Sequence, residues 1–111
     1  MNINIEEYNI YIKPGETDLR KRAETLSFLV RSEMKMEPMS KSIFLFCNKS
    51  KRRLTAILWN GNGWVEITKK LSCTGGTYCW PKNEKVAEEV SIEEVLEMLR
   101  GGNPWRRFPT F

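Results

Sequence analysis

The chain has 111 residues, of which 41% are hydrophobic and 29% are charged, and its formal net charge is +4. These values are typical of one globular domain over residues 1–111, and the mild positive charge favours an anionic partner. No apolar run reaches the roughly 20 residues of a membrane span, and MNINIEEYNI lacks the features of a signal peptide, so we expect a cytoplasmic protein with no membrane partner.

A strand and then a helix are expected in the first third of the chain. Residues 7–12 alternate apolar and polar side chains and stop before a Pro-Gly pair, as a strand does. A cap at Thr17 or Asp18 predicts a helix that runs to about Met36. Apolar residues recur in it at spacings of three and four, which forms one stripe for packing. The stripe consists of Leu19, Ala23, Leu26, Leu29, Val30 and Met34.

Several strands are expected in the middle of the chain. Residues 43–47 are apolar on both faces, which suits a central strand. Residues 53–59 and 64–71 flank the sequence NGNG, which fits a hairpin loop because Asn and Gly tolerate positive φ angles. That loop places Trp59 opposite Trp64. A further strand is expected over 77–80, before a proline.

The last third of the chain contains a second helix. Ser91 and Glu94 have the spacing of a capping box, and two glycines after Leu99 end the helix. The element order predicts an α+β domain, in which an antiparallel sheet of about four to five strands packs against an N-terminal and a C-terminal helix. Residues 103–111 contain two prolines and are interpreted either as an extended tail or as a segment that packs back on the sheet.

The expected strand order joins two basic segments that are separate in the sequence. The turn after residue 47 and the end of the strand at residue 71 lie at the same end of the sheet. The residues that meet there are Lys49, Lys51, Arg52, Arg53, Lys69 and Lys70. Such a cluster is typical of phosphate contacts with nucleic acid. A lysine-rich solvated turn is the alternative interpretation.

Other basic and aromatic residues are candidates for contacts with partners. Four arginines and lysines extend the predicted nucleic-acid surface, namely Arg20, Lys21, Arg106 and Arg107. Trp105 and Phe108 are candidate anchors for a protein partner. Three further tryptophans, Trp59, Trp64 and Trp80, suit either base stacking or a small core, and we expect at least two of them in the core.

The residue inventory argues against catalysis. The chain has no histidine for acid–base work or for activating a nucleophile, and Asp18 is its only aspartate. A two-metal site needs several clustered carboxylates on rigid elements. Cys47, Cys73 and Cys79 form no close pair and are expected to be buried, reduced thiols. We therefore predict no enzyme activity, no metal, no cofactor and no small-molecule substrate.

Four stretches resemble a known family, in the same order and at matching spacings. GETDLRKRAETL resembles G-x-TDMRKG-x-x-x-L, and SIFLFCNKSKRRLTAILWNGNGW resembles a segment that ends in KILWWDG-x-G. CWP resembles F-x-WP, and PWRRF resembles a terminal DWRRP. The family is the small accessory protein (TnpB, or second-reading-frame, product) of bacterial insertion sequences of the IS-sixty-six type. It is unrelated to the RNA-guided nucleases that share the TnpB name.

The resemblance implies a role in moving a transposable element, with catalysis carried by a separate, larger transposase. The positions that match the family pattern are Thr17, Asp18, Arg20, Lys21, Leu58, Trp59, Gly61, Gly63, Trp80, Pro81, Trp105, Arg106 and Arg107. Leu58 stands in place of the family's first tryptophan and Arg22 in place of a glycine. Asn60 replaces the family's aspartate, which suits a turn better than a metal or acid–base role. Two functions follow as hypotheses: an accessory protein that binds DNA at the element ends, or an adaptor that binds the transposase without contacting DNA.

Overall fold

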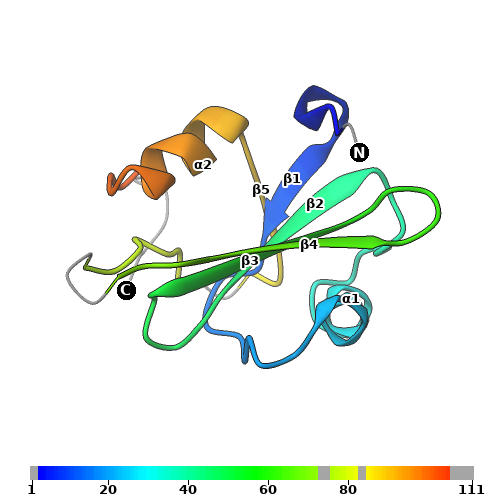
Figure 1. The fold of residues 1–111 in the computed structure, drawn as a ribbon, viewed down its shortest axis with the longest axis horizontal. Helices are drawn as coiled ribbons and strands as arrows, with labels where there is room; N and C mark the ends of the chain where they lie inside the picture. Colours follow the sequence, from blue (N-terminus) through cyan, green and yellow to red (C-terminus); the bar gives the residue numbers. More distant parts are fainter. Residues whose placement is uncertain (1–2, 73–75, 83–84, 106–111) are drawn as a thin grey trace.

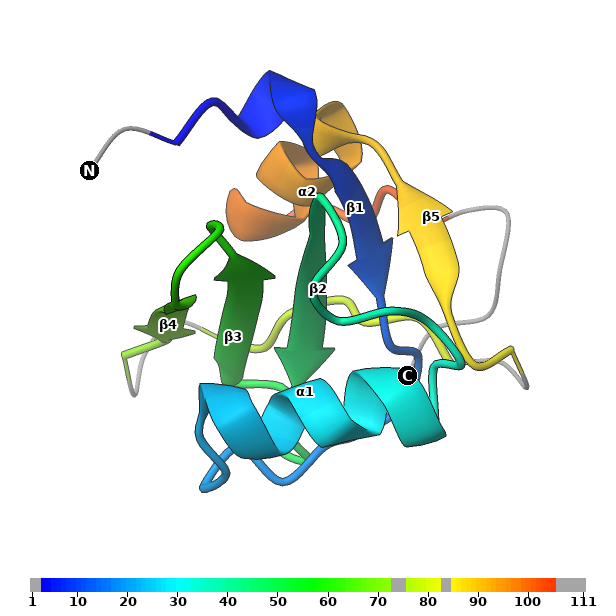
Figure 2. The same ribbon diagram turned by 90° about the vertical axis from the view of Figure 1, so that its right-hand side faces the viewer.

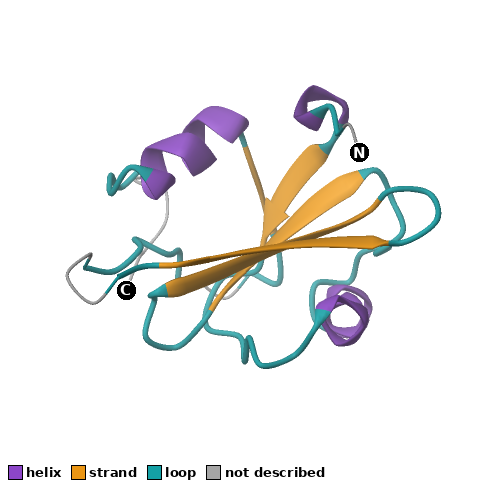
Figure 3. Cartoon of the chain, viewed as in Figure 1, coloured by secondary structure: helices purple, strands orange, loops and turns teal. Residues whose placement is uncertain are grey.

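A computed structural model describes residues 3–72, 76–82 and 85–105 of the chain (Figure 1). The elements in chain order are a 3-10 helix η1 (Ile5–Glu7), β1 (Asn9–Ile12), α1 (Ala23–Ser32), β2 (Ser42–Cys47), β3 (Arg53–Trp59), β4 (Trp64–Lys70), β5 (Glu88–Val90) and α2 (Ile92–Leu99). The sheet lies in the middle, with α1 on one side and with α2 and η1 on the other (Figures 1 and 3). None of the described helices combines the length and apolar content that crossing a membrane requires.

The five strands form one mixed sheet in the order β4-β3-β2-β1-β5. The α+β class is confirmed, but the expected purely antiparallel sheet is wrong, because β1 and β2 run parallel. The other three pairs are antiparallel. Two parallel neighbours cannot be joined by a tight turn, and here the connection from β1 to β2 passes through α1.

The central strand β2 separates two apolar cores. All six of its residues are buried, as the two-sided apolar pattern of residues 43–47 predicted. Phe44 and Phe46 face α1 and pack with the apolar stripe of that helix. Ile43 and Leu45 face the other way, toward α2. Both faces of the sheet are therefore covered by a helix.

The hairpin between β3 and β4 has the predicted register. Trp59 pairs with Trp64 across the two strands, and their rings meet edge to face with centroids 5.2 Å apart. In the loop, the Asn60 N–H donates to the Gly63 carbonyl at 3.1 Å, and the Asn60 side-chain oxygen accepts from the Gly63 N–H at 3.1 Å. Gly61 has a φ of 107°, which glycine adopts without strain.

The first helix begins later than predicted. It starts at Ala23, so the expected start at Thr17 or Asp18 is wrong. The Asp18 carboxylate accepts from the Arg20 backbone N–H at 3.0 Å and from its guanidinium, which stabilises a turn in place of a helical start. The Ala23 N–H donates to the Glu66 carboxylate at 2.7 Å. A residue from β4 thus caps the helix, and local sequence could not have revealed this long-range contact.

The segment 77–80 forms no strand, in contrast to the prediction. It crosses the α2 side of the sheet as a loop whose Trp80 side chain is fully buried, with its indole N–H donating to the Lys13 carbonyl at 3.0 Å. The fifth strand is β5, in the glutamate-rich segment that follows. The predicted capping box at Ser91 and Glu94 is confirmed and opens α2 directly after that strand.

Trp105 packs back into the core beneath α2, which is one of the two arrangements that the sequence left open. Only 1% of its surface is exposed, and its indole N–H donates to the Cys79 carbonyl at 2.7 Å. Cys47 and Cys79 are free thiols, and burial raises the pKa of Cys47 to about 12, so that thiol is neutral at ordinary pH. Cys73 lies outside the described residues.

Candidate functional site

All five strands have a lysine or arginine at the same end of the sheet. Because β1 and β2 are parallel, both of their carboxyl ends lie there, and the antiparallel partners β3 and β5 begin there while β4 ends there. We call this surface the basic sheet end. The basic sheet end consists of Lys13, Lys49, Lys51, Arg52, Arg53, Lys69, Lys70, Lys82 and Lys85. Positive charge therefore extends from one edge of the sheet to the other.

The strand pairing brings together the two basic segments that the sequence analysis joined. Arg53 pairs directly with Lys70, and Leu54 pairs with Lys69. Because side chains alternate along a strand, Arg53 and Lys70 lie on the face covered by α1. Lys69 lies on the opposite face, beside the apolar residues that face α2. The cluster is thus divided between two faces of the sheet.

The turn between β2 and β3 is fixed by Asn48. Its side-chain oxygen accepts from the backbone N–H groups of Arg52 and Arg53, both at 3.1 Å. The Asn48 carbonyl accepts from the Lys51 N–H at 3.0 Å, and Lys51 has a positive φ of 59°. Asparagine side chains commonly organise turns in this way. The turn therefore presents its lysines from a defined backbone.

The Arg52 side chain already forms hydrogen bonds within the protein. Its guanidinium donates to the carbonyls of Gly76, at 2.9 Å, and of Ser72, and lies 3.5 Å from the carbonyl oxygen of Leu71. These carbonyls belong to the segment that leaves β4. The side chain thus ties that segment to the β2–β3 turn, a structural role that the sequence analysis did not anticipate.

Arg20 approaches the basic sheet end but carries its own counter-charge. Two guanidinium nitrogens donate to the Asp18 carboxylate, at 3.0 Å and 2.8 Å. Hydrogen bonding to Arg20 lowers the pKa of Asp18 and raises that of Arg20. The pair is exposed to solvent, so it is a weak but neutralising interaction. Lys21 is exposed beside it and lies outside the helix.

A shallow depression of about 480 Å³ lies between the Asp18 segment and the β2–β3 turn. Its lining residues are Glu16, Thr17, Asp18, Leu19, Arg20, Asn48, Lys49, Ser50 and Arg53. The Thr17 N–H donates to the Cys47 carbonyl at 2.8 Å, which holds the segment against the end of β2. Lys49 and Arg53 form no ion pair with a carboxylate in the part of the chain that the structure describes.

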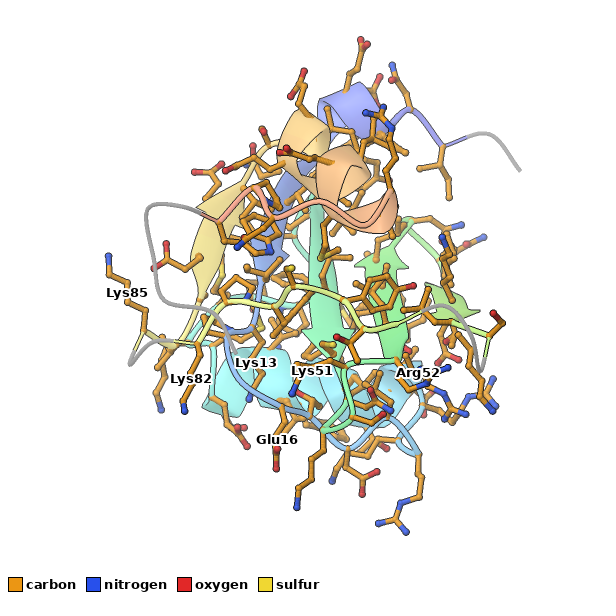
Figure 4. All side chains as sticks on the ribbon, turned by 90° about the vertical axis from the view of Figure 1, so that its left-hand side faces the viewer. Lys13, Glu16, Lys51, Arg52, Lys82 and Lys85 are labelled. Atoms are coloured by element: carbon orange, nitrogen blue, oxygen red, sulfur yellow. The ribbon has the colours of Figure 1, made fainter. Side chains whose placement is uncertain are left out.

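Three lysines of the basic sheet end were missed by the sequence analysis. Figure 4 shows Lys13, Lys82 and Lys85 in one band with Lys51 and Arg52. The Gly15 N–H donates to the Pro81 carbonyl at 3.0 Å, which brings the residues after β1 next to the segment before β5. A parallel β1–β2 pair was the missing signal, because only this pairing puts the end of β1 at the basic edge.

Two of these lysines have acidic partners. The Lys13 ammonium lies 3.4 Å from the Glu33 carboxylate, and the Lys85 ammonium lies 3.9 Å from that of Glu88. Their positive charge is therefore partly compensated at close range. The most available cations of the surface are those whose side chains have neither a carboxylate nor another hydrogen-bond partner among the described residues. They are Lys49, Arg53, Lys69 and Lys70.

The remaining predicted contact residues divide into two groups. Arg106, Arg107 and Phe108 lie outside the described residues. Trp105 is buried, so its side chain presents no surface to a protein partner in this structure. Among the described residues, no three His, Cys, Asp or Glu side chains gather in a way that could hold a metal ion.

An apolar surface lies at the opposite end of β3 and β4. Phe28 on the outer side of α1 is 68% exposed, and Met39 is 54% exposed. Both line a depression of about 620 Å³ together with the paired rings of Trp59 and Trp64. Exposed aromatic and methionine side chains beside a hollow are typical of protein contact surfaces. Phe28 was not predicted as a contact residue, since it does not belong to the buried stripe of the helix.

Comparison with known proteins places these features in context. A family described as IS66 Orf2 like protein matches residues 8–109. The uncharacterized protein y4hO of Sinorhizobium fredii is 30% identical over 101 residues, covering 91% of this chain and 85% of the relative. The uncharacterized protein y4jC of the same organism is 32% identical over 98 residues, covering 88% and 81%. No solved structure matches the chain.

Proposed function

Because this chain belongs to the IS66 Orf2-like family, we propose that it is a non-catalytic accessory protein of transposition that contacts DNA through the basic sheet end. Family membership itself implies a transposition accessory role. The observation that carries the DNA contact is the gathering of a lysine or arginine from all five strands at one end of the sheet. Lysine and arginine contacts to phosphates supply most non-specific DNA affinity.

Lys49 and Arg53 are the best candidates for phosphate contacts. They lie in the depression beside the β2–β3 turn, and neither is paired with a described carboxylate. Arg20 contributes less, because a phosphate would compete with the Asp18 carboxylate for its guanidinium. Arg52 contributes less again, because its guanidinium already binds backbone carbonyls.

A titration against DNA over a series of salt concentrations tests this proposal. With about six phosphate contacts, log K should fall with log salt at a slope of about −5. The double variant Lys49→Ala/Arg53→Ala should make this slope shallower by about 1.8, because two counterion-releasing contacts are lost. The control is Arg31→Ala/Lys41→Ala, which removes the same charge outside the basic sheet end.

Binding to both element-end and unrelated DNA should be measured. Equal loss of affinity in the control variant would mean that only net charge matters. No binding to either DNA at low salt would rule out the DNA contact, and unchanged binding by the double variant would rule out this site.

A second function is favoured by the apolar depression on the far side of the molecule. We propose that Phe28 and Met39 contact the transposase of the same element, which makes the protein an adaptor. Exposed apolar side chains of this size in a hollow are typical binding anchors. The adaptor hypothesis based on Trp105 loses its physical basis, since a side chain 1% exposed contacts a partner only after local unfolding.

The double variant Phe28→Ala/Met39→Ala should weaken binding to the purified transposase by at least about tenfold, the effect of losing roughly 1.4 kcal/mol at a contact surface. Binding can be measured by co-purification and by titration of the two proteins. The matched control is Val86→Ala, which truncates a side chain that is 49% exposed elsewhere. Undiminished binding by the double variant would exclude this surface as the adaptor site.

A further inference from the structure

The outer edge of β4 is open. This strand lies at one side of the sheet (Figure 2), and no strand in the described ranges pairs with its outer side. It pairs with β3 at seven consecutive positions and contains no proline or bulge, and the lysines that can protect an edge are confined to its last two positions, Lys69 and Lys70. Ile67 at its centre is 59% exposed. A regular edge with an exposed apolar centre is a surface to which another strand can add.

The hairpin hydrogen bonds determine which backbone groups face outward. The Asn60 N–H donates to the Gly63 carbonyl, and at the other end the Leu71 N–H donates to the Arg52 carbonyl at 2.8 Å. Hydrogen-bonded and non-hydrogen-bonded pairs alternate along antiparallel strands. Every second residue from Gly63 to Leu71 therefore bonds to β3. The residues between them, whose N–H and C=O groups face outward, are Trp64, Glu66, Thr68 and Lys70.

We propose that a second copy of this chain pairs with β4 in the antiparallel direction, with Ile67 on the two-fold axis. This register joins each outward-facing residue of one copy to an outward-facing residue of the other. Trp64 meets Lys70 of the second copy, and Glu66 meets Thr68. All the open hydrogen-bonding groups of the strand are satisfied, as a self-complementary interface requires.

Charge favours antiparallel over parallel pairing, and the matching of all four outward-facing residues favours Ile67 on the axis. The two lysines of β4 lie at one end of the strand, so antiparallel pairing places those of the two copies at opposite ends. There Lys69 faces Val65, and Lys70 faces the Trp64 ring, where a cation–π contact is favourable. Parallel pairing would set lysines beside lysines. A shift that put Glu66 on the axis would bring two carboxylates together, which is unfavourable.

The apolar surface beside the edge also favours a second copy of the chain as the partner of β4. A groove of about 350 Å³ runs between the sheet and α2, and its lining is almost entirely apolar. Val65 and Ile67 form its wall at the open edge. On the two-fold axis the two Ile67 side chains form a non-hydrogen-bonded pair, in which side chains come closest together. Pairing thus buries the exposed apolar centre of β4 and joins the two grooves.

The mass of the full-length chain in solution tests the dimer. Light scattering should show twice the 13.0 kDa of one chain, reached as the concentration rises toward about 0.3 mM. Ile67→Lys puts two like charges on the axis. Thr68→Pro removes an outward N–H and leaves the backbone bonds to β3 intact, although it also removes the hydrogen bond between the Thr68 and Thr55 hydroxyls at 2.9 Å. Both should weaken dimerisation by at least about tenfold.

The control is Val86→Lys, which adds the same charge at a residue that is 49% exposed before β5, at the opposite edge of the sheet. It should remain a dimer. A monomeric wild-type chain at about 0.3 mM would overturn the proposal. So would a dimer that both edge variants leave unchanged, or one that the control disrupts as strongly as the edge variants do.

Cysteine cross-linking tests the register independently. In Ile67→Cys the two new thiols face each other across the axis, within the Cα separation of about 4.4–6.8 Å that a disulfide needs. Mild oxidation should link the copies, and Val65→Cys and the wild-type chain should stay unlinked. Linking through position 65 would contradict the register. These variants leave Lys49 and Arg53 in place, so the dimer and the DNA contact can fail separately.

Discussion

Replacing Trp105 with alanine is expected to lower the free energy of unfolding by about 3–5 kcal/mol. The side chain is 1% exposed and packs with Trp80 and Met98 in the core beneath α2. Its removal leaves a large cavity and also leaves the Cys79 carbonyl without the indole N–H at 2.7 Å. Denaturant titration followed by circular dichroism measures the change.

The control for this variant is Phe28→Ala, which also removes an aromatic ring, but one that is 68% exposed. Its effect should stay within about 0.5 kcal/mol. If Trp105→Ala changed stability by less than about 1 kcal/mol, the core placement of the tryptophan would be contradicted. A truncation that removes Trp105 would likewise destabilise the core, so it is a poor test of partner binding.

Replacing Arg52 with alanine is expected to lower the free energy of unfolding by about 2–3 kcal/mol. The guanidinium donates to the carbonyls of Gly76 and Ser72, and charge-assisted hydrogen bonds are among the stronger ones in proteins. Arg52→Lys should recover only part of the loss, because an ammonium group cannot reproduce the planar fork of the guanidinium. Thermal or denaturant unfolding measures both variants.

The neighbouring arginine supplies the matched control. Arg53→Ala removes the same type of side chain at the next position, where the side chain makes no hydrogen bond to the described residues. It should lower the free energy of unfolding by about 0.5 kcal/mol or less. On DNA the order should reverse, with Arg53→Ala weakening binding more than Arg52→Ala at temperatures where both are folded. Equal stability losses would contradict the structural role of Arg52.

Local patterns in the sequence predicted the antiparallel hairpin and α2 correctly. The register of Trp59 with Trp64 follows from the turn chemistry of NGNG, and Ser91 with Glu94 places the helix start by a contact within one turn. Such features depend on residues close in the chain. They can therefore be read without knowing the rest of the fold.

The errors arise where distant segments meet. The sequence of residues 9–12 does not indicate that this strand runs parallel to β2. The start of α1 depends on the carboxylate of Glu66, which lies in β4 and is distant in the sequence. The candidate site shows the same limit. The six central basic residues were grouped from the hairpin alone, whereas Lys13, Lys82 and Lys85 required the parallel pair and β5.

The position of β1 between β2 and β5 has a consequence for how the chain folds. During synthesis β1 is the first strand to be made, and its neighbours β2 and β5 are made later. Of the five strands, β5 is the last in the chain. The hairpins of β2, β3 and β4 need only local contacts and can form early. The open side of β1 stays without a partner until Ile10 meets Val90. We therefore expect closure of this edge, with α2 and Trp105 behind it, to be a late step in folding, and a chain that stalls before it would expose an apolar strand edge to aggregation.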